Sequence, residues 1–146
     1  MGAVKPCIRE GTIEEAVWIS AQLPEFVAPY PASAYRERLA GVPHLILLAC
    51  VGGKAAGFKV GYELEGSFYS WMGGVLPDYR RRGVARALAS EQESWAKQRG
   101  YSRLLMKSRN EHRAMLIFAL SNGFSISSVE KRPVLSANRI WLEKVL

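Results

Sequence analysis

The chain has 146 residues, of which 49% are hydrophobic, and a formal net charge of +7. This length is typical of one domain with a sizeable core, so residues 1–146 are interpreted as a single domain. No apolar run approaches the ~20 residues of a membrane span, and the N-terminus lacks the long apolar segment of a secretory signal. We therefore expect a cytoplasmic protein without a membrane partner.

The positive charge is concentrated in one short segment. Arg80, Arg81, Arg82 and Arg86 lie within seven residues, and without them the net charge is 7 − 4 = +3. The other basic residues are scattered and form no stripe with aromatic residues between them, which is the pattern of nucleic-acid binding. A nucleic-acid-binding domain is therefore a disfavoured alternative, and we expect no nucleic-acid partner.

The two cysteines, Cys7 and Cys50, are far apart in the sequence. Neither has the neighbouring ligands that metal sites need, and two cysteines make no disulfide framework. We interpret both as buried or inert thiols and expect no metal.

The first elements are a short strand at 4–9 and a helix over about 13–22. The helix is indicated by a capping box, in which Thr12 is followed three positions later by Glu15. Prolines interrupt residues 23–31.

A second helix is predicted to begin after Ser33, acting as its N-cap, and to reach about residue 40. An apolar strand at 45–51 then turns through Gly52-Gly53 into a strand at 55–62. A turn near Glu65-Gly66 begins the strand that ends at Val75.

The segment after Val75 predicts an anion site. A helix begins near Gly83, and a helix start leaves backbone N–H groups unpaired and carries partial positive charge. Gly83 lets the backbone approach a ligand closely, and Arg80, Arg81 and Arg82 add charged donors. A phosphate is the ligand that this chemistry favours.

The remaining elements follow in a regular order. The helix after the arginines is closed by Gly100, and strands are predicted at 101–107, 124–130 and 139–145. The helix at 114–120 is apolar nearly all round, which predicts packing on several sides. The order of strands and helices favours an α/β (α+β) fold, a mixed sheet with helices on both faces.

The spacing Arg80-x-x-Gly83-x-Ala85 resembles the pyrophosphate loop of the GNAT acetyltransferase superfamily, which uses acetyl-CoA. Asn110 after the next strand and the sequence Asn122-Gly123-Phe124 fit the same family order. The resemblance implies a GNAT-like fold. Its central twisted sheet is mixed and mostly antiparallel, with one splayed parallel strand pair.

The resemblance also implies residues that bind acetyl-CoA, the expected co-substrate. Val75 and Leu76 would offer backbone groups to the pantetheine arm, and Gly73-Gly74 fits a bulge beside it. The side chain of Asn110 would reach the same arm, although a plain helix cap is an open alternative. The pyrophosphate would be held by Arg80, Arg81, Arg82, Gly83, Val84 and Ala85. For the arginines, a solvated surface is the alternative.

Proton transfer has no evident catalyst in the sequence. Many family members carry a glutamate on the strand at 67–75 and a tyrosine four residues before the Gly-Phe pair. Here the strand has no carboxylate and the second position holds Ala119. The candidates are Glu63, which could act through water or be merely solvated, and Tyr69, which could be packing. The catalytic residues stay unassigned.

The acceptor site is predicted in the proline-broken loop. Glu25, Phe26, Tyr30 and Trp71 suit an amine held by a carboxylate and aromatic faces. An equal alternative is that Phe26 and Tyr30 pin the loop to the core.

Together these features predict transfer of an acetyl group from acetyl-CoA to a primary amine of a small molecule or protein. The alternative is a catalytically weak GNAT-like module that binds or senses acyl-CoA. The resemblance leaves room for a homodimer.

Overall fold

The computed structural model describes residues 5–146, which form one seven-stranded sheet and four α-helices. The order of elements is the predicted one. The elements are β1 (Cys7–Glu10), α1 (Ile13–Ser20), α2 (Ala32–Leu39), β2 (His44–Val51), β3 (Lys54–Leu64), β4 (Ser67–Val75), α3 (Val84–Gln98), β5 (Arg103–Arg109), α4 (Arg113–Ser121), β6 (Ser125–Glu130) and β7 (Arg139–Val145), with 3₁₀ turns at Pro77–Tyr79 and Leu135–Ala137.

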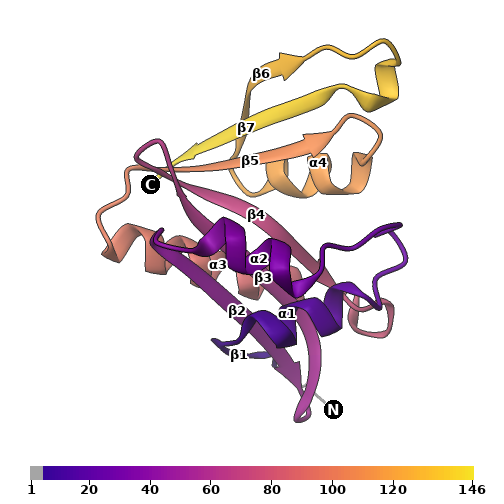
Figure 1. The fold of residues 1–146 in the computed structure, drawn as a ribbon, viewed down its shortest axis with the longest axis vertical. Coiled ribbons are helices and arrows are strands. Elements are labelled where there is room, and N and C mark those ends of the chain that lie inside the picture. The colour runs from indigo at the N-terminus through magenta and orange to yellow at the C-terminus, as the bar shows by residue number, and fades with distance from the viewer. Residues whose placement is uncertain (1–4) are drawn as a thin grey trace.

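The strands lie in the order β1-β2-β3-β4-β5-β7-β6. Every neighbouring pair is antiparallel except β4 and β5, which run parallel. Figure 1 shows β5, β7 and β6 on one side of β4, and β3, β2 and β1 on the other. The predicted mixed, mostly antiparallel sheet is confirmed.

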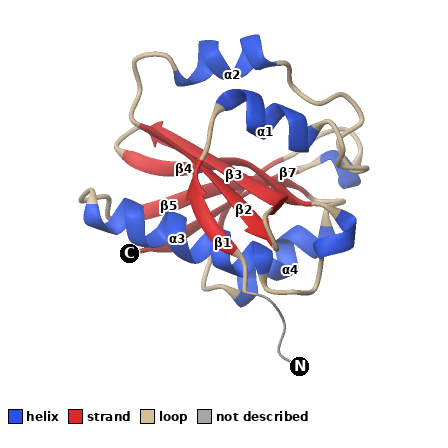
Figure 2. Cartoon of the chain, turned by 90° about the horizontal axis from the view of Figure 1, so that it is seen from below, coloured by secondary structure: helices blue, strands red, loops and turns tan. Residues whose placement is uncertain are grey.

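Two helical layers cover the sheet (Figure 2). Helices α1 and α2 lie on one face, and α3 and α4 lie on the other. The core is divided accordingly: Ile19 of α1 packs with Phe58 and Val60 on the first face, and Leu88 of α3 packs with Phe68 on the second. The helix α3 connects the two parallel strands, as a parallel pair requires.

The hairpin turns follow from glycine. Gly52 and Gly53 have φ of 57° and 80°, and Glu65 and Gly66 have φ of 51° and 82°. Two consecutive residues with positive φ are what a two-residue hairpin loop needs to match the twist of its strands. Both predicted turns are confirmed.

One helix start differs from the prediction. The capping box of Thr12 and Glu15 is present at the start of α1, but α2 begins at Ala32 with Pro31 as its N-cap. The prediction of Ser33 as the cap is wrong. Proline fixes φ near the value that leads into a helix, so Pro31 starts the turn earlier and Ser33 falls inside it.

The packing predicted for α4 is also wrong. Only Ala119 is buried in this helix, and the side chain of Ile117 is 65% exposed. Met115 and Leu120 are exposed as well. The helix covers the sheet with one side only, because no element of the described chain packs over its outer side.

The two cysteines lie directly opposite each other on β1 and β2. Cys7 is exposed and Cys50 is half-buried, and both are free thiols. Cys7 is therefore not buried, and whether either thiol is inert stays a prediction. Opposite residues of an antiparallel pair share a face and have Cα atoms ~4.5–5.5 Å apart, which a disulfide can span.

We predict that Cys7 and Cys50 form a reversible disulfide when the protein is incubated with oxidised glutathione. The two thiols lose two protons and two electrons to the added disulfide, which is reduced. Mass spectrometry of the unreduced digest should find the Cys7 and Cys50 peptides joined. The Cys7→Ser variant is the control and should show no such product. If both thiols stay independently alkylatable after oxidation, the register of β1 is wrong.

Candidate active site

The parallel strands β4 and β5 separate part of the way along their length. They pair at three positions only, where Phe68, Tyr69 and Ser70 lie opposite β5. Beyond Ser70, β4 continues to Val75 and β5 continues to Arg109, but the two strands no longer pair with each other. Backbone groups on the facing edges are left without a strand partner, and such groups need other partners. The gap can therefore accept an extended ligand.

A bulge in β4 lies where the gap opens. The register against β3 shifts between Ser70 and Met72, so Trp71 is the extra residue. The predicted bulge at Gly73-Gly74 is wrong, because both glycines pair regularly with β3. At Gly74 the absence of a side chain has a packing reason instead: a Cβ there would collide with Leu23.

The end of β4 directs backbone groups in two directions. The N–H of Leu76 donates to the carbonyl of Ala56 at 2.8 Å, so it faces β3. Hydrogen-bonding groups alternate in direction along a strand, and those of Val75 therefore point toward the gap. The Val75 carbonyl accepts a bond from Arg80 Nε at 2.9 Å. The N–H of Val75 is the group that faces the gap, whereas the N–H of Leu76 is already used.

An open set of N–H donors surrounds the start of α3. The N-cap is Gly83, with φ of 78° and no side-chain cap. Arg81 also has a positive φ of 61°. Within residues 5–146, none of the backbone N–H groups from Arg81 to Ala85 donates to a protein acceptor. A concave run of free N–H groups at a helix start is an anion-binding arrangement.

The three arginines of the loop have different surroundings. Arg80 makes bonds of 2.9 Å to both carboxylate oxygens of Glu25. Arg81 and Arg82 are exposed, and within the described chain neither has a carboxylate partner. Arg80 therefore anchors the loop at residues 21–31, while Arg81 and Arg82 remain free for an anion. Glu25 is engaged with Arg80.

The proton-transfer candidates lie apart. Glu63 is opposite Phe68, at the end of β4 away from the loop, and accepts a hydrogen bond of 2.8 Å from Tyr101. Tyr69 lies beside the gap, packed between Tyr62 and Trp141. Burial raises the pKa of Tyr69 to about 12. Its hydroxyl therefore stays protonated near neutral pH and can donate a hydrogen bond, but the raised pKa makes it a weak acid.

Asn110 follows β5 and holds a neighbouring connection. Its backbone N–H donates to the Asn138 carbonyl at 2.8 Å, and its Nδ2 donates to the Leu135 carbonyl at 3.1 Å. The side chain thus supports the segment between β6 and β7. Its contact with a pantetheine arm stays a prediction.

The predicted acceptor residues are only partly brought together. The rings of Tyr30 and Trp71 are 5.6 Å apart, and Phe26 packs against the core. Sequence reasoning missed Arg38, which lies over Trp71 at 4.6 Å. An arginine on an exposed helix gives no signal of its own. A pocket of about 290 Å³ is lined by Tyr30, Ala34, Glu37, Arg38 and Trp71.

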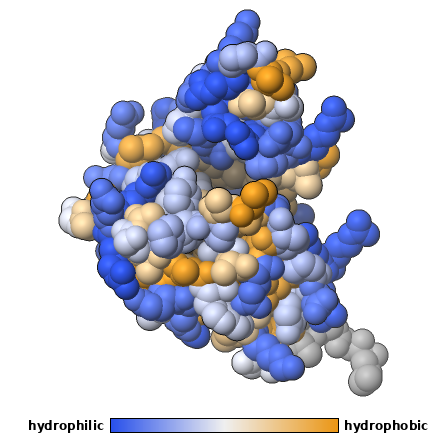
Figure 3. Space-filling view, turned by 45° about the vertical axis from the view of Figure 1, so that its right-hand side comes forward, coloured by the Kyte–Doolittle hydropathy of each residue, from blue (hydrophilic) through white to orange (hydrophobic). Residues whose placement is uncertain are grey.

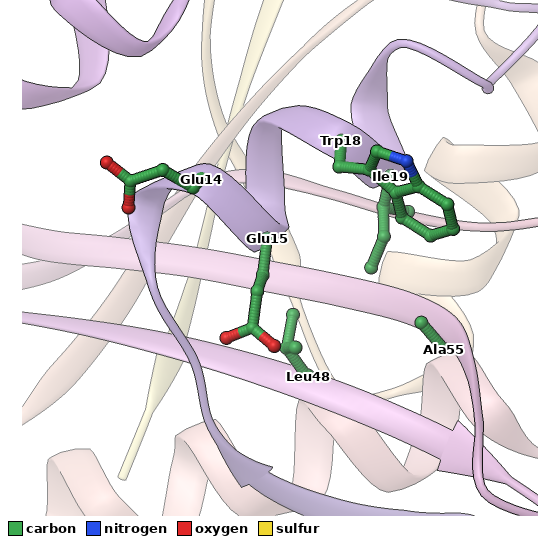
Figure 4. Close-up of a pocket in the computed structure, with 6 residues that line it drawn as sticks. All are labelled: Glu14, Glu15, Trp18, Ile19, Leu48 and Ala55. Carbon is green, nitrogen blue, oxygen red and sulfur yellow. The ribbon is translucent and has the colours of Figure 1, made fainter.

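A second pocket, of about 300 Å³, lies beside α1 (Figure 4). Figure 4 shows Glu14 directed away from the pocket and Glu15 directed toward the strands. Glu15 caps Thr12 and pairs with Arg9 at 2.7 Å, and Glu14 pairs with Arg36 at 3.1 Å. Because both carboxylates already have partners, this pocket is a weaker candidate site.

Figure 3 shows exposed apolar residues in small patches among charged ones on the face that it displays. None of the helices within residues 5–146 is long and apolar enough to cross a membrane. In the same residues, no group of three potential metal ligands comes together.

A sheet that separates along its one parallel pair, beside a helix start with open N–H groups, suits an extended ligand with an anionic end. Carriers of activated acyl groups, such as coenzyme A thioesters, have this chemistry. The model of the acetyltransferase (GNAT) family matches residues 15–124, which is more than half of the sequence. The chain belongs to the GNAT acetyltransferase family.

Several solved structures share this fold. The ribosomal-protein-S18-alanine N-acetyltransferase of Escherichia coli is 19% identical, with a TM-score of 0.82 over 97% of this chain and 94% of that one. Ard1 from Thermoplasma volcanium is 19% identical, with a TM-score of 0.80 over 97% of both chains.

A GNAT acetyltransferase from Elizabethkingia anophelis, solved with acetyl-CoA bound, is 16% identical. Its TM-score is 0.73 over 97% of this chain and 98% of that one. No curated protein matches the sequence.

We predict that Gly83→Glu weakens the binding of coenzyme A at least tenfold, or about 1.4 kcal/mol, because a carboxylate would stand among the open N–H groups. Gly66→Glu is the matched control. Both glycines have a positive φ, and a Cβ at either position meets nothing within 4 Å. Calorimetric titration should show unchanged binding for the control. Equal affinities of the parent and Gly83→Glu would place the anion site elsewhere.

Proposed function

We propose that this protein is an N-acetyltransferase that moves an acetyl group from acetyl-CoA to a primary amine of a small molecule or protein. The observation that carries the proposal is the strand gap beyond Ser70, which leads directly to the open N–H groups before α3. Family membership supports acetyl-CoA as the co-substrate. The bound acetyl-CoA of the Elizabethkingia anophelis structure is consistent with it.

The residues present fit this co-substrate. The N–H groups from Arg81 to Ala85, with the free guanidinium groups of Arg81 and Arg82, would bind the pyrophosphate. The N–H of Val75 would bind the pantetheine arm, which would take the place of the missing strand partner. Arg80 would act indirectly, by fixing the carbonyl of Val75 and the loop that carries Glu25.

The chemistry requires one bond exchange and one proton transfer. The acetyl C–S bond of the co-substrate breaks as a C–N bond to the acceptor forms. The amine loses a proton, and the departing thiolate gains one. An amine with a pKa of ~10.4 is mostly protonated at neutral pH, so a proton must leave before attack. With its pKa raised to about 12, the Tyr69 hydroxyl is a weaker acid than a thiol and can offer the thiolate a hydrogen bond only. Water is the group that we propose to accept the amine proton and to protonate the thiolate.

A second candidate function is an acyl-CoA-binding module without turnover. It is favoured by Ala119 at the position of the family's tyrosine and by the strand Ser67–Val75, which has no carboxylate. Glu63 already accepts a hydrogen bond from Tyr101, which makes it less available as a base for the acceptor amine.

The location that we propose is the cytoplasm, as expected from the sequence. A primary amine remains the proposed partner.

The direct test is release of free thiol from acetyl-CoA across a panel of small amines and peptides, with a reaction lacking amine as the control. Turnover with at least one amine above that control is expected. A rise in the thermal midpoint with acetyl-CoA, but no turnover with any amine, would favour the binding module. No thermal shift at millimolar acetyl-CoA would contradict the co-substrate itself, since a ligand at a hundredfold excess over Kd stabilises by about 2.7 kcal/mol.

We predict that Tyr69→Phe and Glu63→Gln each lower kcat by about tenfold or less. Neither residue is placed as a dedicated catalyst, which would contribute about 10²–10⁴-fold. Because the pKa of Tyr69 is raised to about 12, its hydroxyl does not titrate between pH 6 and 10. The rate should therefore rise with pH toward the pKa of the amine, as measured by a pH profile of kcat/KM. A thousandfold loss in either variant, with acetyl-CoA affinity unchanged, would identify that residue as the catalyst.

A further inference from the structure

A continuous row of aromatic rings crosses the face of the sheet that carries α1 and α2. Trp71 lies 5.6 Å from Tyr30 and 5.9 Å from Tyr62. Tyr62 lies 5.4 Å from Tyr69, which lies 5.7 Å from Trp141. The row runs from the loop before α2, across β3 and β4, to β7. It therefore spans the two sides of the strand gap.

Arg38 lies at the end of this row that is formed by Tyr30 and Trp71. Its guanidinium carbon is 4.6 Å from the Trp71 ring and 6.0 Å from the Tyr30 ring. Its Nη1 donates to the hydroxyl of Tyr62 at 3.3 Å. Within residues 5–146, no carboxylate lies within 4 Å of this guanidinium. By contrast, Arg36 on the same helix pairs with Glu14.

Lys107 lies at the other end of the row, 5.0 Å from the Trp141 ring. An acidic group is close to this end, because Trp141 Nε1 donates to the carboxylate of Glu130. Glu130 also interacts with Arg132. The Lys107 end is thus partly compensated in charge. At the Arg38 end, Glu37 lines the same pocket as Arg38 but forms no ion pair with it.

The position of Arg38 suits recognition of a carboxylate. A guanidinium stacked on rings keeps its edge N–H donors available, and these match the two oxygens of a carboxylate. Arg38 and Trp71 both line the pocket of about 290 Å³, together with Tyr30, Ala34 and Glu37. Trp71 is also the residue at which β4 bulges and the gap opens.

We propose that Arg38 binds a carboxylate of the acceptor, and that the acceptor is a small amine that carries a carboxylate and an apolar group. The rings of Tyr30 and Trp71, which line the pocket, hold the apolar group, and the amine lies toward the gap beside Trp71. This inference rests on the proposed acetyltransferase function. It makes Arg38 a specificity-determining residue, with no part in bond breaking.

The test uses a product-like probe, so that it needs no turnover. Binding of N-acetylphenylalanine and of N-acetylphenylalaninamide is measured by calorimetry in the presence of coenzyme A. The acid is expected to bind the parent protein at least tenfold more tightly than the amide. Arg38→Gln should remove this preference, and Arg38→Lys should keep part of it. Arg36→Gln is the matched control and should keep all of it.

Three results would overturn the proposal: equal binding of acid and amide, no binding of either at millimolar concentration, or a preference that Lys107→Gln removes and Arg38→Gln keeps. Kinetics provide a second readout, in which Arg38→Gln raises KM for phenylalanine while kcat changes little. Thermal unfolding shows whether each variant is folded. Failure of the acetyltransferase function itself would appear separately, as no release of thiol from acetyl-CoA by the parent protein with any amine.

Discussion

The separation of β4 from β5 beyond Ser70 is the constraint on which the rest of the site depends. A strand edge inside a sheet normally has its N–H and C=O groups paired, and here the inner edges of two long strands have no strand partner. The gap is held open from both sides. Pairing with β3 fixes β4 along its whole length, and pairing with β7 fixes β5. The bulge at Trp71 lies at the opening and directs an aromatic side chain toward α1 and α2.

The Arg80 side chain connects the end of β4 with the loop at residues 21–31. It binds the last carbonyl of β4 and both oxygens of Glu25. The loop at residues 21–31, which carries Tyr30, is therefore tied to the segment that precedes α3. Of the three arginines in the loop, Arg80 therefore has a structural role, whereas Arg81 and Arg82 face solvent. A surface ion pair contributes ~1 kcal/mol or less to stability, so the value of this one lies in positioning.

Patterns among neighbouring residues predicted most of the fold. They did not predict which residues far apart in the sequence lie close together in the structure. Short stretches of neighbouring residues determine the turns at Gly52-Gly53 and Glu65-Gly66 and the capping box of α1. They also indicate the order of elements. The bulge at Trp71 depends instead on the pairing register with β3. The approach of Cys7 to Cys50 and of Arg38 to Trp71 joins residues far apart in the chain. A single sequence contains no signal for such contacts.

The most direct test of the account is amide hydrogen exchange with and without acetyl-CoA. If the gap and the start of α3 hold the co-substrate, exchange should slow at Val75 and at the amides from Arg81 to Ala85, which have no protein acceptor. Exchange in β6, at the far edge of the sheet, should not change. Saturating acetyl-CoA that leaves Val75 and the amides from Arg81 to Ala85 unprotected, or protects only the pocket beside α1, would contradict the account.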